Sequence, residues 1–150
     1  MANYNFEKDL KIAQQTEMNV ALKLTRIFNW KIFAFNNDAK YDIVFKDAKD
    51  NIITVEVKED FTCARTNNVG LEYSCRGKPS GISISKADYY FYRCHRPNNE
   101  VVDLLIKTST LKEMVDGCLY FRTVNGGDKD SNSLNYLFKF DILRTLAEEI

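Results

Sequence analysis

The chain has 150 residues, of which 45% are hydrophobic and 28% are charged, a composition typical of one soluble globular domain. We therefore expect a single domain over residues 1–150 that buries its own core without disulfide or metal support. The 21 basic and 21 acidic residues exclude a histone-like coat of positive charge, but they leave room for a local basic patch that binds nucleic acid.

The first predicted element is a long amphipathic helix over residues 6–28. Apolar residues such as Leu10, Val20 and Leu24 recur at helical spacing and fall on one stripe. Glu17 lies near the middle of this stripe, where an ionised carboxylate is costly unless a cation or a metal ion neutralises it. The alternative is a break of the helix near residues 14–16, which would leave Glu17 in an exposed first turn.

Strands are predicted after the helix. A strand at residues 30–35 precedes two strands at residues 41–45 and 52–58, which the polar turn at residues 47–51 joins into a hairpin. Antiparallel pairing through this turn brings Asp42 to within one residue of Glu56. Because side chains alternate along a strand, Glu56 and Lys58 are expected to point to one face and Val55 and Val57 to the other.

The rest of the chain predicts short strands and helices. In order, these are a strand at residues 71–75, a short helix that ends at residues 86–87, strands at 89–92 and 101–107, a helix at 110–115, strands at 119–124 and 134–140, and a helix at 142–149. Gly117 is expected to end one helix and Asp141 to cap the next, and residues 125–133 form a polar surface loop. This order predicts an α/β (α+β) protein with a central mixed β-sheet flanked by helices.

Two carboxylates, Asp42 and Glu56, are expected to face each other across the hairpin, where like charges repel. A divalent cation between them would remove the repulsion, since Mg²⁺ accepts one or two protein carboxylates beside waters and phosphate oxygens. Lys58 would then add positive charge beside the metal-bound water or a phosphate. The alternative is a solvated strand face with a surface ion pair.

The order of these residues resembles the PD-(D/E)xK nuclease superfamily: Glu17 on a first helix, Asp42 on a strand, and Glu56-Val57-Lys58 on the next strand. The stretches KYDI at residues 40–43 and ITVEVK at 53–58 match the metal-binding hairpin of that superfamily. The run SGISISKADYY at residues 80–90 is similar to small stand-alone nucleases of bacteriophages and mobile elements. The likeness covers residues 15–95. The classical Pro-Asp dipeptide is absent, since Tyr41 precedes Asp42, but many members of the superfamily also lack that proline.

The resemblance implies a restriction-endonuclease-like core, similar to that of Holliday-junction resolvases, and a metal-dependent endonuclease that hydrolyses phosphodiester bonds in duplex or branched DNA. It implies that Asp42, Glu56 and the carbonyl group of Val57 bind Mg²⁺ or Mn²⁺, that Lys58 positions or polarises the attacking water, and that Glu17 binds a second metal or its water. A homodimer would suit the cutting of both strands. The alternatives are a non-catalytic nucleic-acid-binding module on the same fold and a protein-interaction domain.

The middle of the chain is its most basic part. Residues 58–96 hold seven basic and four acidic residues, and basic side chains fix a nucleic acid through its phosphates without reading its bases. The expected contacts are Arg65, Arg76, Lys78, Ser80 and Lys86. The stretch RGKPSG at residues 76–81 lets backbone amides approach a phosphate, or forms a plain exposed turn. It is not a Walker A loop, so no nucleotide cofactor is expected.

The cysteines and the histidine do not predict a zinc site. The four cysteines lack a CxxC pair, and Cys94 and His95 are adjacent, so we expect buried reduced thiols rather than zinc ligands or a Cys/His nucleophile. The aromatic residues at 89–92 are expected to pack in the core rather than to stack on bases. The polar N-terminus and the absence of a long apolar run favour a cytoplasmic protein without a membrane partner, in a bacterial host if a phage or mobile element encodes it.

Overall fold

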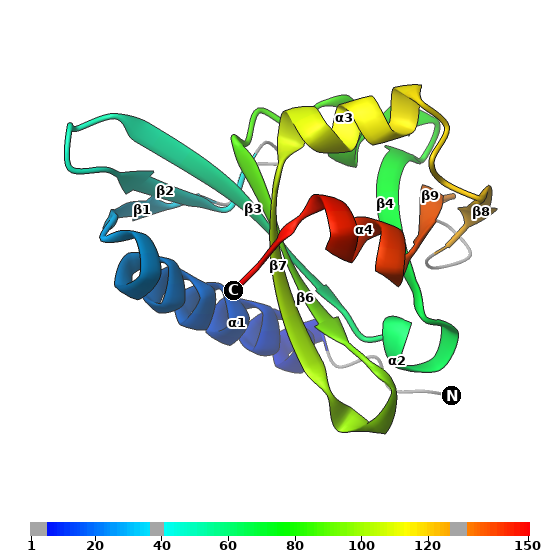
Figure 1. Cartoon of the computed structure of the whole chain (residues 1–150), viewed down its shortest axis with the longest axis horizontal. Helices are drawn as coiled ribbons and strands as arrows, with labels where there is room; N and C mark the ends of the chain where they lie inside the picture. The colour runs from blue at the N-terminus through cyan, green and yellow to red at the C-terminus, as the bar shows by residue number, and fades with distance from the viewer. Residues whose placement is uncertain (1–5, 37–40, 127–131) are drawn as a thin grey trace.

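The computed structural model describes residues 6–36, 41–126 and 132–150 (Figure 1). No helix in these ranges is long and apolar enough to cross a membrane. The elements in chain order are α1 (Phe6–Phe28), β1 (Lys31–Phe35), β2 (Ile43–Lys46), β3 (Ile52–Asp60), α2 (Cys63–Thr66), β4 (Asn68–Cys75), β5 (Lys78–Pro79), the 3₁₀ helix η1 (Gly81–Ser83), β6 (Tyr89–His95), η2 (Pro97–Asn99), β7 (Val101–Lys107), α3 (Thr108–Asp116), β8 (Arg122–Asn125), β9 (Leu134–Lys139), α4 (Phe140–Leu146) and β10 (Glu148–Glu149).

A mixed six-stranded sheet forms the centre of the molecule, with strand order β1-β2-β3-β6-β7-β10. The first three strands form an antiparallel meander, and β6 pairs in parallel with β3. Strand β7 then pairs antiparallel with β6, and the short β10 completes the far edge. The expected central mixed sheet with flanking helices is therefore confirmed.

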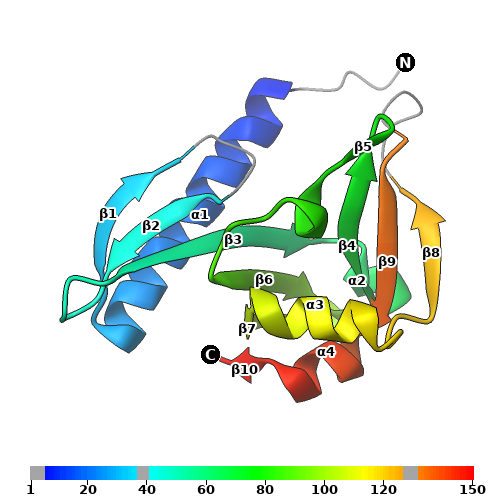
Figure 2. The same ribbon diagram turned by 90° about the horizontal axis from the view of Figure 1, so that it is seen from above.

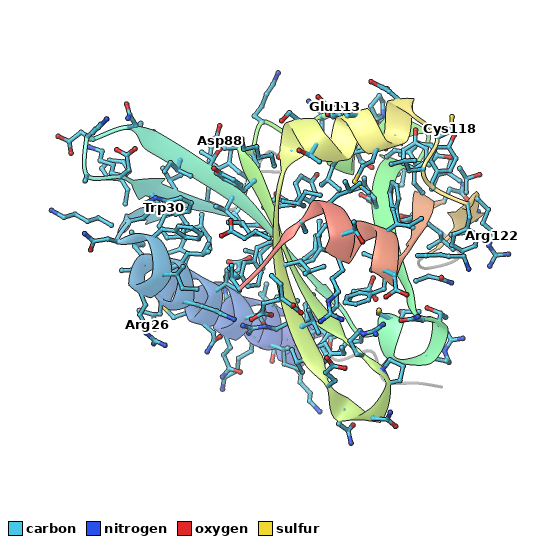
Figure 3. The ribbon with its side chains drawn as sticks, in the orientation of Figure 1. Arg26, Trp30, Asp88, Glu113, Cys118 and Arg122 are labelled. Atoms are coloured by element: carbon cyan, nitrogen blue, oxygen red, sulfur yellow. The ribbon has the colours of Figure 1, made fainter. Side chains whose placement is uncertain are left out.

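Helix α1 covers one face of this sheet, but only with its C-terminal half. Its buried residues join strand residues and Trp30 in one apolar cluster: Val20, Ala21, Leu24, Trp30, Ile43, Phe45, Val55, Phe91 and Leu105. Trp30 stands between α1 and the hairpin of β1 and β2 (Figure 3). Leu10, expected in the buried stripe, is instead 46% exposed, so the N-terminal half of α1 extends beyond the sheet. The helix is continuous through residues 14–16, and the alternative of a break there is wrong.

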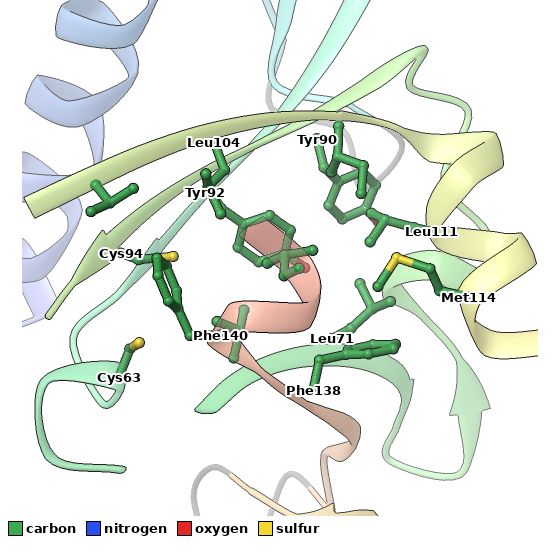
Figure 4. Close-up of a cluster of buried hydrophobic side chains, with 14 of the residues drawn as sticks. Cys63, Leu71, Tyr90, Tyr92, Cys94, Leu104, Leu111, Met114, Phe138 and Phe140 are labelled. Carbon is green, nitrogen blue, oxygen red and sulfur yellow. The ribbon is translucent and has the colours of Figure 1, made fainter. Parts of the chain in front are cut away.

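A second sheet covers the other face together with α3 and α4, and the sequence patterns did not predict this layer. Its four antiparallel strands have the order β5-β4-β9-β8, and Figure 2 shows it on the side of the central sheet away from α1. The second apolar cluster lies between the two sheets (Figure 4) and includes Leu71, Tyr90, Tyr92, Cys94, Leu104, Leu111, Met114, Phe138 and Phe140. The buried Tyr90 and Tyr92 confirm that the aromatic run packs in the core.

The end of the chain departs most from expectation. The last helix begins at Phe140 and ends at Leu146, because Glu148–Glu149 pairs with β7 as β10. Asp141 therefore lies in the first turn of α4 rather than at its cap, which Lys139 occupies without a side-chain bond.

Smaller differences occur before this point. The strand expected at residues 119–124 begins only at Arg122. No helix ends at residues 86–87, since η1 stops at Ser83. Gly117 ends α3 as expected, with its amide donating to the carbonyl oxygen of Glu113. Residues 127–131 of the expected polar loop lie outside the described residues.

Candidate active site

The candidate site lies at the edge of β3 beyond the end of its partner β2. The two strands pair only as far as Ile43 and Val55, so Asp42 stands at the point where this edge of β3 loses its partner. The amide of Asp42 donates to the carbonyl oxygen of Val55 at 3.0 Å, and Oδ2 of Asp42 accepts a bond of 2.7 Å from the amide of Val57. The hairpin register that the sequence predicted, with Asp42 beside Glu56, is confirmed.

The side chains of Glu56 and Lys58 project from β3 toward the second sheet. Their side chains form an ion pair of 3.1 Å between Oε1 of Glu56 and Nζ of Lys58, in which Glu56 is 12% exposed and Lys58 is 41% exposed. Burial lowers the pKa of Lys58, but the neighbouring carboxylate of Glu56 outweighs this effect, so the pKa of Lys58 is raised. Lys58 therefore remains a positive charge at the edge of the site.

Glu17 approaches the same site from α1. It is half-buried where the helix leaves the sheet. Burial and then the negative charges of Asp42 and Glu56 raise its pKa to about 7. The two strand carboxylates behave alike: burial raises the pKa of Asp42 despite the hydrogen bond from Val57, and burial raises the pKa of Glu56 despite Lys58. Three carboxylates thus repel one another around one ammonium group.

This repulsion makes the stability of the metal-free protein depend on pH. Because the pKa of Glu17 is about 7 in the folded chain and about 4.5 otherwise, the folded state holds a proton that the unfolded state has already lost. The unfolding free energy should therefore fall as pH rises from 4.5 to 7, by about 1 kcal/mol after allowance for solvent screening.

Urea titration of wild type and Glu17→Gln at pH 5 and pH 8 measures this effect. The variant should show a smaller fall than wild type, whereas the exposed Glu113→Gln on α3 (Figure 3) should match wild type. An equal fall in wild type and Glu17→Gln would show that Glu17 is not part of the repelling group.

The donor set suits a hard cation that keeps most of its water. Within the described ranges, no three His, Cys, Asp or Glu side chains stand close enough to hold a metal ion by themselves. Mg²⁺ needs only one or two carboxylates, however, and takes its remaining ligands from water and phosphate. Asp42 and Glu56 supply those carboxylates. The carbonyl of Val57 lies on the same edge, because the amide and carbonyl of a strand residue point the same way.

Glu72 on β4 is a further acidic neighbour of this group. Its oxygens accept hydroxyl bonds from Ser80 at 3.0 Å and from Ser133 at 2.6 Å, and its charge helps to raise the pKa of Glu56. It lines a cavity of about 200 Å³ with Lys58 and Tyr90. Ser80, expected to contact nucleic acid, thus holds Glu72 at the site.

The glycine in the SGIS stretch lets the chain pass close to Glu72. A Cβ atom at Gly81 would lie 2.1 Å from the carbonyl oxygen of Glu72, and the φ angle there is +52°. Gly81→Ala should therefore lower the unfolding free energy by about 2–3 kcal/mol in urea titration. Gly77→Ala is the matched control, since φ is +75° but no atom lies within 4 Å, and it should cost about 1 kcal/mol. Equal costs would mean that the close approach contributes nothing.

The basic residues expected to bind nucleic acid do not form one patch. Arg65 lies in α2 and Arg76 and Lys78 lie around the turn after β4, and these positions are separated by the length of β4, about 25 Å. Lys86 is exposed beside the start of β3, where its carbonyl accepts a bond from Thr54. Arg65 instead shares a groove with Arg122, which the sequence reasoning missed because it lies in the acidic last third of the chain.

The cysteines and the histidine lie outside this site. All four cysteines carry free thiols. Cys63 and Cys94 are buried in the core between the sheets, where burial raises the pKa of Cys63 to about 11 and that of Cys94 further. Nε2 of His95 lies 2.7 Å from a carboxylate oxygen of Glu59. The thiols of Cys63 and Cys94 are therefore unsuited to act as nucleophiles at neutral pH.

No protein-family model matches this chain, and no curated protein is similar to it. The likeness of residues 15–95 to nucleases therefore remains a prediction from the sequence.

Proposed function

We propose that this protein is a metal-dependent endonuclease of the PD-(D/E)xK type that hydrolyses phosphodiester bonds in DNA. The observation that carries the proposal is the meeting of Asp42, Glu56 and Lys58 where β3 loses its partner strand. The element order supports a restriction-endonuclease-like core, because a first helix that carries Glu17 precedes three antiparallel strands, and β6 then pairs in parallel with β3.

The charges of the site favour a cation as its natural complement. Burial raises the pKa values of Glu17, Asp42 and Glu56, and the charges of neighbouring carboxylates raise those of Glu17 and Glu56 further, while Lys58 offsets part of the negative charge at Asp42 and Glu56. The chain keeps this arrangement although it costs stability, which is typical of a functional site. Asp42 and Glu56 would hold Mg²⁺ or Mn²⁺ together with the carbonyl of Val57, and Glu17 would bind a second ion or its water.

When bound, the ion would supply a water of lowered pKa and a positive charge for the phosphate. The residues of the chain would provide orientation. The bond from Val57 fixes the carboxylate of Asp42, and Glu56 holds the ammonium group of Lys58 within 3.1 Å. Lys58 would orient the attacking water and stabilise the negative charge that grows on the phosphate oxygens. Cutting both strands of a duplex would take two such sites, which a homodimer would supply.

A panel of substrates tests the proposal. Supercoiled plasmid, linear duplex, single-stranded DNA, a four-way junction and RNA should be incubated with Mg²⁺, Mn²⁺ or EDTA, and the products resolved on gels. Cleavage of at least one DNA substrate with a metal ion, and none with EDTA, is the expected result. Cleavage that continues in EDTA, or that occurs in none of the DNA substrates, would contradict the proposal.

A non-catalytic nucleic-acid-binding module on the same fold is the second candidate. The ion pair between Glu56 and Lys58 favours it, because the two charges can satisfy each other without a metal. Such a module would bind DNA in EDTA as well as in Mg²⁺. It would also keep its affinity in Glu56→Gln.

A further inference from the structure

An aromatic ring stands exposed next to the candidate site. Phe61 directly follows β3, three residues beyond Lys58, which is about 10 Å along a strand. Its side chain is 58% exposed. One ring face stacks on His95, with ring centroids 4.4 Å apart and planes inclined by 16°. His95 is itself held by Glu59 at 2.7 Å, so the ring of Phe61 is presented to solvent on a fixed support.

Two grooves meet at this ring. One, of about 440 Å³, lies between the first half of α1 and the end of β3, and Glu17 and Val57 line it. The other, of about 580 Å³, runs between α2, β4 and the strands β8 and β9. Phe61 and Glu59 line both grooves. A polymer strand that is bound along the second groove and extends toward the candidate site therefore passes the ring of Phe61.

Both carboxylates that line the second groove are held by hydrogen bonds. Asp60 accepts bonds from the amides of Cys63 and Gly70, and Glu59 accepts a bond of 2.6 Å from Thr16 besides its contact with His95.

Arg65 and Arg122 line the same groove and are exposed. Neither forms an ion pair with a carboxylate of the described residues. Arg122 projects from β8 at the rim of the molecule (Figure 3). Two exposed guanidinium groups that are not held in an ion pair suit the phosphates of a nucleic-acid strand.

We propose that Phe61 is a stacking platform for an unpaired base of a DNA strand whose phosphates lie between Arg65 and Arg122. A base within a duplex is covered on both faces by its neighbours, so only a single strand or an unpaired segment can place a base on the ring. This inference rests on the proposed function for its nucleic-acid substrate, and it assigns that substrate to the single-stranded or locally unpaired class.

Binding in EDTA tests the inference apart from cleavage. Fluorescence anisotropy of a labelled 20-nucleotide single strand should show binding about 5- to 150-fold weaker in Phe61→Ala than in wild type, the range expected from base–aromatic stacking. Phe33→Ala is the matched control. Phe33 on β1 is 60% exposed, and Nζ of Lys46 lies 4.4 Å from the centroid of its ring. It lines neither groove, so its replacement should leave the affinity for the single strand unchanged. Phe61→Ala and wild type should bind a blunt-ended, fully paired duplex without a loop with equal affinity.

A second variant guards against a folding artefact. Phe61→Trp keeps an aromatic ring, so it should bind the single strand as wild type does, and the strand should quench the added tryptophan fluorescence. Equal affinity of Phe61→Ala and wild type for the single strand would overturn the inference, as would equal losses in Phe61→Ala and Phe33→Ala.

The inference and the proposed function can fail separately. If Phe61→Ala binds normally while wild type cleaves DNA, the platform is wrong and the nuclease stands. If Phe61→Ala binds weakly but no DNA is cleaved, the platform stands and the nuclease is wrong. A wild-type protein that binds no DNA would overturn both.

Discussion

Replacing Asp42 by asparagine should reduce metal-dependent DNA cleavage by about 10³-fold or more, while the fold is retained. The substitution removes the charge that would bind the metal ion but keeps the shape of the side chain. An amide oxygen can still accept the 2.7 Å bond from the amide of Val57, so the hairpin keeps its local geometry. The loss of activity would therefore report the charge of the carboxylate and not its structural bond.

The same substitution should raise the stability of the metal-free protein slightly. Burial raises the pKa of Asp42, and the negative charge of Asp42 contributes to the raised pKa values of Glu17 and Glu56. A neutral side chain removes this repulsion, so the melting temperature of Asp42→Asn should equal or exceed that of wild type at pH 8. A variant that is both more stable and inactive is the result expected for a functional carboxylate.

Asp47→Asn is the matched control, because Asp47 lies in the exposed turn of the same hairpin and accepts bonds from Lys49 and Asn51. It should cleave DNA at the wild-type rate. Lys58→Ala should lose activity to a similar extent as Asp42→Asn, but it should also lose stability, since Glu56 would be left without its partner. Undiminished cleavage by purified Asp42→Asn would refute the proposed chemistry.

The elements that the sequence predicted best are those whose signals are local. Helical spacing defines α1 over residues 6–28, and alternation with a polar turn defines the hairpin of β2 and β3. Asp47 closes that turn by its own side-chain bonds to Lys49 and Asn51, so the register that places Asp42 beside Glu56 is encoded within about fifteen residues. The core of the candidate site could therefore be predicted from sequence alone.

The second sheet could not be predicted in this way, because its pairing is not local. The residues of β4 pair with residues of β9 that lie 60 to 71 positions later in the chain, and nothing in either strand specifies the other. The position of the second sheet places Glu72, which Ser80 and Ser133 hold, beside the candidate site. Phe61 and Arg122 were missed for the same reason, since only the packing of the two sheets brings them to a common groove.

An ion-pair network lies on the face of the central sheet that α1 covers. Removing its carboxylate is expected to have the largest effect on the stability of the protein. Asp103 on β7 is 8% exposed and receives two bonds from Arg93, at 2.9 and 3.0 Å, and one of 2.6 Å from Lys23 on α1. Lys23 also donates to the carbonyl oxygen of Ile150 at 2.9 Å. This single carboxylate thus ties α1 and the C-terminus to the central sheet.

Asp103→Ala should lower the unfolding free energy by about 3 kcal/mol or more, because it leaves two partly buried cations without a counter-charge. The pKa of Asp103 gives the sign of its pH dependence. Burial raises that pKa, but the bonds from Arg93 and Lys23 outweigh burial and lower it below 3.8. The carboxylate therefore stabilises the fold above pH 3.8, and this contribution is lost as pH falls through the lowered pKa. Wild type and Asp103→Ala should converge in stability at strongly acidic pH.

Urea titration at pH 7 with Glu149→Ala as the matched control measures the effect. Glu149 pairs with Arg144 at 2.9 Å, but the two side chains are 46% and 42% exposed, so its loss should cost no more than about 0.5 kcal/mol. The difference between the two variants reports the effect of burial on the ion pair, because both substitutions remove a carboxylate that is paired with an arginine. Similar costs for the two variants would show that the network of Asp103 is as dispensable as a surface pair, and α1 would then be held to the sheet by its apolar cluster alone.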